Sequence, residues 1–132
     1  MARRCLLVGA LCLALGIALA PASLAQGVKP EQATAAQKES ARASFSAGME
    51  AYNDKRFEEA LVAFQKSYGE VASPNSHLMV ARTLRSVGRV AEAYDEFQAV
   101  IDEAEAAAKD DKKYQQSADA AHADLTLSLI HI

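Results

Sequence analysis

The chain has 132 residues, 51% of them apolar, and contains no Trp. That length leaves room for one domain, and an Ala-rich, aromatic-poor composition favours closely packed helices over a β-sandwich. The formal net charge is −3 at pH 7. This argues against a nucleic-acid or anionic-membrane ligand, because either would require a basic patch.

Residues 1–25 have the features of a secretory signal peptide. Arg3-Arg4 form a short basic start, 5–20 is an unbroken apolar run, and the small residues Ser23 and Ala25 mark a cleavage site. We therefore expect an exported protein, periplasmic or in the cell envelope, that is cut after Ala25. The alternative is a retained membrane anchor, although 16 apolar residues span a bilayer core poorly.

Both cysteines, Cys5 and Cys12, lie in this segment. Processing would therefore leave a chain without any disulfide, despite its export to an oxidising compartment. Its net charge would be −5, because Arg3 and Arg4 are two of the 14 basic residues that oppose 17 acidic ones. The fold of the processed chain is expected to rest on packing alone.

Five helices are expected in the rest of the chain. The first covers 31–52, with Phe45 and Met49 on its apolar face, and nothing breaks its helical spacing. Pro30 suits the first turn of this helix, because its fixed φ is already helical. Residues 26–40 would then form a linker and the start of the helix.

The other helices follow from the same periodicity and are expected at 57–71, 75–87, 90–109 and 110–126. Ser73 can cap the third helix and Pro74 can take its first position. Gly88 is expected to stop it in a left-handed conformation, and Asp110-Asp111 can cap the fifth. No window alternates convincingly with a period of two, so the sequence predicts an all-α fold.

Part of the chain repeats at an offset of 33 residues. The segments FEEALVAF (57–64) and VAEAYDEF (90–97) share an apolar-x-Glu-Ala-apolar-x-x-Phe pattern. At the same offset, Gly48 aligns with Ala81. Small residues at matching positions let the two helices of a pair approach closely. The Phe that ends each segment then fills the space beside them.

These recurring positions resemble the tetratricopeptide repeat (TPR) family. The resemblance covers about 41–104, and Gly88 matches the family's turn glycine, whereas Lys55 stands at that place in the first repeat. It implies two repeats (41–109), each an antiparallel helical hairpin. The long N-terminal helix and a C-terminal capping helix (110–126) would cover the ends of so short an array.

The last six residues, 127–132 (LSLIHI), do not fit the rest of the chain. They are apolar and β-prone, and they resemble the translation of a sequencing adapter. We therefore expect a non-native tail, with the natural protein continuing differently after Thr126. The alternative is a genuine hydrophobic C-terminal strand. The TPR resemblance implies that such envelope proteins often continue into a small β-rich domain or a membrane segment.

The sequence contains no recognisable pattern for catalysis. His77, His122 and His131 are isolated, without the i, i+4 spacing of a helical metal site, and are interpreted as surface or helix-end residues. The densest carboxylate cluster is Asp102, Glu103 and Glu105. We interpret this cluster as a solvated helix face rather than an acid–base pair. Nucleophile-elbow, phosphate-loop and dinucleotide patterns are missing too, so we expect no enzyme, cofactor or metal site.

In the TPR family the first helix of each hairpin lines a concave groove. Mapped onto this chain, that surface carries a set of polar residues expected to bind a partner: Arg42, Asn53, Asn75, Arg82 and Arg85. Arg82 and Arg85 stand one turn apart on an otherwise acidic protein, and could receive a partner's carboxylate through charge-assisted hydrogen bonds. The alternative is that both are solvated or paired with nearby Glu.

The expected function is that of a protein–protein interaction adaptor of the bacterial cell envelope. It would bind a peptide or protein partner in the groove, and the two arginines favour an acidic one. The alternative is a spacer or oligomerisation module of a longer envelope protein, whose functional domain would follow Thr126. Membrane contact would require retention of residues 1–25 or a spanning segment beyond Thr126.

Overall fold

The computed structural model describes residues 26–130, so the predicted signal peptide and the last two residues of the tail lie outside the described part. The described elements are α1 (Ala35–Asn53), α2 (Phe57–Glu70), α3 (Pro74–Ser86), α4 (Val90–Ala108), the short 3₁₀ helix η1 (Lys112–Tyr114) and α5 (Gln115–Ile130). The prediction of an all-α fold is confirmed.

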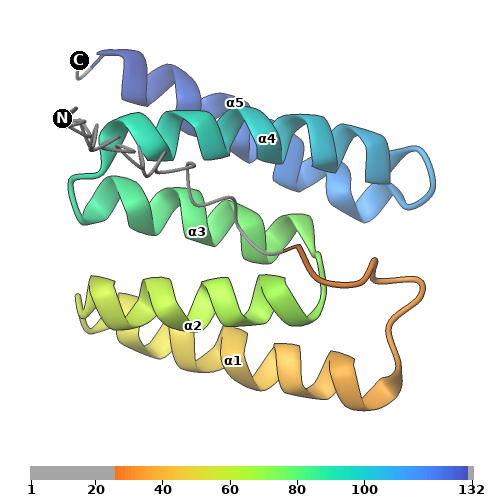
Figure 1. Cartoon of the computed structure of the whole chain (residues 1–132). Coiled ribbons are helices and arrows are strands. Elements are labelled where there is room, and N and C mark those ends of the chain that lie inside the picture. Colours follow the sequence, from red (N-terminus) through yellow and green to blue (C-terminus); the bar gives the residue numbers. More distant parts are fainter. Residues whose placement is uncertain (1–25, 131–132) are drawn as a thin grey trace, which may run out of the picture.

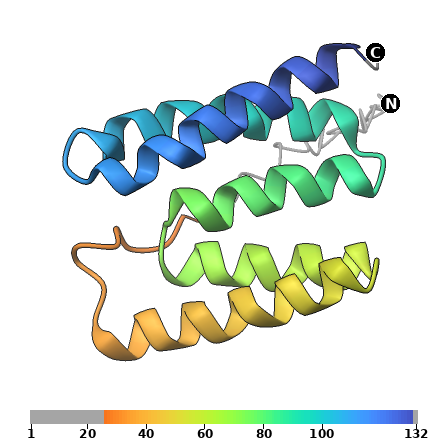
Figure 2. The ribbon, with the colours of Figure 1, turned by 180° about the vertical axis from the view of Figure 1, so that it is seen from behind.

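The helices form two layers, in which neighbours along the chain pack against each other and run in opposite directions (Figure 1). The view from behind shows α1, α3 and α5 on the near face, with α2 and α4 behind them (Figure 2). The N-terminal ends of α1, α3 and α5 therefore lie at the same end of the molecule. α3 is central and packs against α2, α4 and α5.

A hydrophobic core joins the two layers. The large side chains Phe64, Val80, Phe97 and Val100 are all 0% exposed. Small residues in the same core, including Ala60 and Ala93 of the repeated segments, Ala81 and Ala121, let the helix backbones come close. Phe45, Met49 and Tyr52 of α1 are half-buried and cover one side of this core.

The 33-residue repeat is also present in the turns that join each pair of helices. Lys55, after α1, has a φ of 62°, and Gly88, after α3, has a φ of 83°. In each turn the next residue, Arg56 or Arg89, donates its amide to a helix carbonyl, which closes a Schellman motif. The predicted left-handed stop at Gly88 is confirmed, and Lys55 adopts the same conformation although a side chain disfavours it.

Gly48 allows the close approach of α1 and α2 that the repeat predicts. A Cβ built on Gly48 would lie 2.6 Å from Cε1 of Phe64. Phe64 is completely buried, so its ring has little freedom to move away. The ring occupies the space that a side chain at position 48 would need.

The first helix begins later than predicted. Thr34 and Gln37 form a capping box, in which the Gln37 amide donates to Thr34 Oγ1 (3.2 Å) and the Thr34 amide donates to Gln37 Oε1 (2.9 Å). This reciprocal cap sets the start of α1 at Ala35. Pro30 lies instead in a turn that precedes the helix.

Other predicted caps and the predicted C-terminal boundary were partly wrong. Ser73 precedes α3, but its side chain makes no capping hydrogen bond, and Asp111 caps η1 rather than α5. α5 continues through Ile130, so the described part of the apolar tail is helical and not a strand. The side chains of Leu127, Leu129 and Ile130 nevertheless stay exposed.

Candidate binding groove

A hollow of about 810 Å³ lies where the N-terminal halves of α1 and α3 meet η1. We call it the groove; it is lined by Pro30, Glu31, Lys38, Ala41, Arg42, Phe45, Ser46, Ser67, Val71, Ser73, Asn75, Ser76, Asp110, Asp111, Lys113 and Tyr114. The elements that contribute most of its lining, α1, α3 and η1, meet near the end of the molecule where α1, α3 and α5 begin (Figure 2). A hollow of this size has the volume of a typical ligand pocket.

The groove contains two cations, Lys38 and Arg42, that form no ion pair with a carboxylate of residues 26–130, although Glu31 and Asp110 also line it. Lys38 and Arg42 are exposed and stand one turn apart on α1. The third cation of the groove, Lys113, is paired with Asp111 at 2.6 Å. Lys38 and Arg42 are therefore the side chains of the groove best able to accept an acidic group.

Hydrogen bonds between serine side chains fix the floor of the groove. The buried Ser67 Oγ donates to the Ala41 carbonyl and lies 2.9 Å from Ser76 Oγ, which ties α2 to α1 and α3. At the rim, Asn75 accepts a hydrogen bond from Ser117 of α5. The floor therefore needs no ligand to hold its shape.

The residues predicted to bind a partner fall in three places. Arg42 and Asn75 both line the groove. Asn53 is the last residue of α1 and is exposed, but it lies at the other end of that helix. Arg82 and Arg85 do not line the groove, since they lie further along α3, where they face α5.

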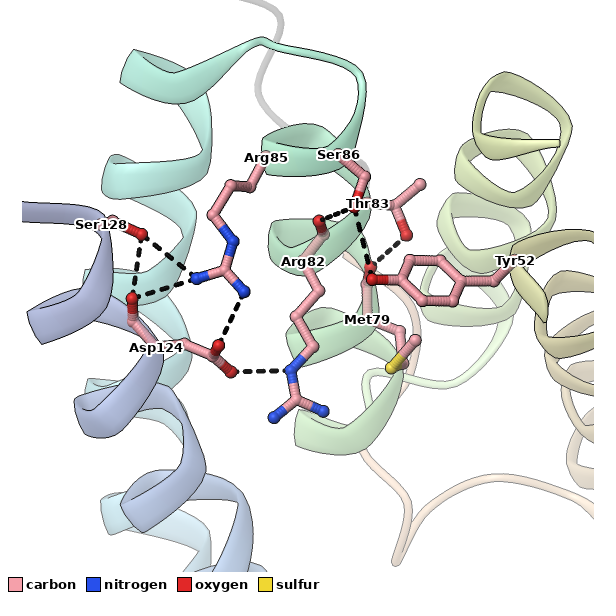
Figure 3. Close-up of polar contacts among 8 residues, drawn as sticks. All are labelled: Tyr52, Met79, Arg82, Thr83, Arg85, Ser86, Asp124 and Ser128. Carbon is pink, nitrogen blue, oxygen red and sulfur yellow. Dashed lines mark hydrogen bonds and ion pairs between the residues drawn. The ribbon is translucent and has the colours of Figure 1, made fainter. Parts of the chain in front are cut away.

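Arg82 and Arg85 share one carboxylate, that of Asp124 in α5 (Figure 3). Arg82 Nε lies 2.7 Å from Asp124 Oδ2, and Arg85 Nη2 lies 2.8 Å from Asp124 Oδ1. Arg85 Nη1 also donates to the Asp124 carbonyl at 3.1 Å and to Ser128 Oγ at 3.3 Å. The Asp124 side chain is only 10% exposed, so this cluster fastens α5 to α3.

This cluster changes the reading of the two arginines. The sequence analysis gave solvation or pairing with a nearby Glu as the alternative to partner binding. In the structure both arginines pair with an Asp that lies 39 residues or more away in sequence. Arg85 also stacks over the ring of Phe97, 5.3 Å from its centroid. Three guanidinium nitrogens of the two arginines make no hydrogen bond with residues 26–130, namely Nη1 and Nη2 of Arg82 and Nε of Arg85 (Figure 3).

A second polar cluster, built around His77, was missed by the sequence analysis. His77 is 5% exposed, so its interpretation as a surface histidine was wrong. Its Nε2 lies 2.6 Å from Glu96 Oε2 and its Nδ1 lies 2.5 Å from Glu103 Oε2. The Tyr68 hydroxyl donates to the same Glu103 oxygen at 3.1 Å, and the Tyr68 and His77 rings stack at 4.5 Å.

The His77 cluster also corrects the interpretation of the carboxylates in α4. Glu103 is part-buried and hydrogen-bonded, whereas Asp102 and Glu105 are exposed as expected. Burial alone would lower the pKa of His77, but its hydrogen bonds to Glu103 and Glu96 outweigh this effect and raise that pKa to about 9. The imidazolium therefore joins α3 to α4 at neutral pH.

Stability is expected to fall between neutral and alkaline pH because of His77. Its folded pKa of about 9 lies above the ordinary value of 6.5, so the stabilisation is complete below pH 6.5 and is lost as pH rises through 9. We expect a loss on the order of 2 kcal/mol in the free energy of unfolding between pH 6.5 and 9.5. Urea unfolding across this range measures it, and a His77→Gln variant that shows the same slope would contradict the assignment.

Within residues 26–130, no group of three His, Cys, Asp or Glu side chains is arranged to bind a metal ion. None of the described helices combines the length and the apolar character needed to cross a membrane. Comparison with known proteins gives no match: no family model fits the chain, and neither a curated protein nor a solved structure is significantly similar to it.

Proposed function

We propose that the protein is an interaction module of the bacterial cell envelope that binds an acidic peptide segment of a partner in the groove. The observation that carries this proposal is the pair Lys38 and Arg42. Both cations are without a carboxylate partner among residues 26–130, and both border a hollow of about 810 Å³. Exposed cations without an ion pair beside a concave surface are suited to recognising carboxylates.

The surroundings of these two cations support a peptide rather than a single small anion. Phe45, Val71 and Tyr114 give the groove apolar contact area next to the charges, and Asn75 adds a polar group at the rim. The N-terminal ends of α1 and α3 add positive partial charge at the same place. A segment with an acidic residue next to an apolar one would use all of these features.

The two-layer arrangement is consistent with the TPR resemblance, in which the first helix of each hairpin faces the partner. The signal-like sequence of residues 1–25 supports an envelope location. Arg42 and Asn75 remain in the proposed site. Arg82 and Arg85 are poor probes of binding, because replacing them would also break the contact between α3 and α5.

A displayed random peptide library, selected against the chain from Gln26 onward, tests this proposal. We expect enrichment of peptides with Asp or Glu next to an apolar residue. A Lys38→Glu/Arg42→Glu variant should bind them at least about tenfold more weakly, with an unchanged helical signal, because both side chains are exposed. Binding should also weaken as salt is added.

Lys55→Glu/Lys66→Glu is the matched control, since it changes the net charge by the same amount and both side chains are exposed and do not line the groove. It should leave the affinity within about twofold. Equal weakening by both variants would mean that only the net charge matters. A selection without enrichment would favour the spacer alternative.

A further inference from the structure

The segment that follows the predicted cleavage site is held on the end of α2. Gly27 donates its amide to the Tyr68 carbonyl at 3.2 Å, and the Ala72 amide donates to the Val28 carbonyl at 2.8 Å. A Cβ built on Gly27 would lie 2.7 Å from the Glu70 carbonyl carbon. The backbone at position 27 therefore lies directly against the last turn of α2, where only glycine fits.

Gln26 is held by its side chain as well as by the position of Gly27. Its Nε2 donates to the Tyr68 hydroxyl at 3.3 Å. Gln26 also borders a hollow of about 660 Å³, together with Gly27, Ser40 and Glu70. The backbone nitrogen of residue 26 is thus confined to the region beside the C-terminal end of α2.

Glu70, the last residue of α2, has an unsatisfied carboxylate oxygen at this place. Its Oε1 accepts a hydrogen bond from Ser40 Oγ at 2.9 Å. Its Oε2 is buried and has no hydrogen-bond partner within residues 26–130. A buried acceptor without a donor is unfavourable. No Lys or Arg lines the hollow beside it.

A cation that carries several hydrogen-bond donors would satisfy this site. The negative end of the α2 dipole lies here as well, and it favours a positive charge. No Lys or Arg of residues 26–130 pairs with Glu70, and a cut before Gln26 would place a new cation at this hollow. Hydrolysis of the 25–26 peptide bond adds water, leaves a carboxylate on Ala25, and turns the amide nitrogen of Gln26 into a protonated α-amine.

We propose that export processing after Ala25 creates an α-ammonium group on Gln26 that pairs with Oε2 of Glu70. The new terminus would then be part of the fold, as the donor that the end of α2 otherwise lacks. Because Gly27 and Val28 already order the segment, little further conformational entropy is lost on pairing. Removal of the signal peptide would thereby stabilise the exported domain against unfolding.

The first test is the mass and N-terminal sequence of the protein exported from a Gram-negative host, which should begin at Gln26.

The second test removes the positive charge of the α-amine of Gln26. Glutaminyl cyclase converts an N-terminal Gln to pyroglutamate, in which the α-amine attacks the side-chain carbonyl and ammonia leaves. In urea, cyclisation should raise the unfolding equilibrium constant about tenfold and lower the melting temperature by about 5 °C.

A Glu70→Gln variant gives the decisive comparison. In that background the effect of cyclisation should shrink to the part that comes from loss of the Nε2–Tyr68 hydrogen bond, because the partner of the amine is gone. Glu58→Gln, at the opposite end of α2 and exposed, should leave the effect unchanged. An uncyclised Gln26→Ala chain keeps the amine but loses the Tyr68 contact, so it should still be destabilised by Glu70→Gln. Equal effects of cyclisation in all backgrounds, or a terminus at another residue, would overturn the proposal.

Discussion

Replacing Phe64 with Ala is expected to lower the free energy of unfolding by about 3–5 kcal/mol. Phe64 is 0% exposed, and its ring supplies the three atoms nearest to a Cβ built on Gly48. Its ring centroid lies 5.4 Å from that of Phe45 and 6.4 Å from that of Tyr52. The substitution would leave a cavity between α1 and α2 that these half-buried rings can only partly fill.

Chemical denaturation with urea measures this effect, with the helical signal as the readout. A domain of this size has a total stability of about 5–15 kcal/mol, so the variant should lose a large fraction of it and unfold at a much lower urea concentration. Phe57→Ala is the matched control, because Phe57 opens the same helix but is only half-buried. It should lose about 1–2 kcal/mol. Equal losses in both variants would mean that the Gly48 contact is unimportant.

Replacing Asp124 with Ala is expected to lower the free energy of unfolding by about 2–3 kcal/mol. This loss lies between the losses expected for an exposed and for a fully buried ion pair. The Asp124 side chain is 10% exposed, whereas those of its arginine partners are 31–33% exposed. The substitution leaves Arg82 and Arg85 without their shared carboxylate. Because this cluster supplies most of the side-chain hydrogen bonds between α3 and α5, the loss should be greatest in α5.

Amide hydrogen exchange locates that loss. In the Asp124→Ala variant, protection should fall first in α5 and much less in α1 and α2, which do not touch the cluster. Asp119→Ala is the control on the same helix, since Asp119 is exposed and bonds only Gln115. Its effect should stay below about 0.5 kcal/mol. A uniform loss of protection along the chain would show that the cluster does not act locally.

The local features of the fold could be predicted from the sequence because they depend on neighbours in the chain. The starts of α2 and α4 and the left-handed turn at Gly88 follow from apolar spacing and from the repeat. The start of α1 was missed because two local signals compete there. The reciprocal bonds between Thr34 and Gln37 prevail over the favourable φ of Pro30.

The polar clusters could not be predicted in the same way, because their members are distant in sequence. His77 meets Glu96 and Glu103 only after α3 and α4 have packed, and Arg82 meets Asp124 across 42 residues. A partial signal existed, since Glu96 and Glu103 are seven residues apart and so share a helix face. This spacing could not indicate which histidine or arginine would pack against the two glutamates.

The shared direction of α1, α3 and α5 has an electrical consequence. At the end where these helices begin, α2 and α4 finish, so at this end the face of α1, α3 and α5 carries positive helix ends and the face of α2 and α4 carries negative ones (Figures 1 and 2). At the opposite end of the molecule the signs are reversed. The side chains add to this difference, with Lys38 and Arg42 on the first face and Glu96 and Glu103 at the second. Near the groove the helix ends therefore favour an acidic partner on the face of α1, α3 and α5, whereas over the whole molecule the dipoles of the antiparallel helices largely cancel.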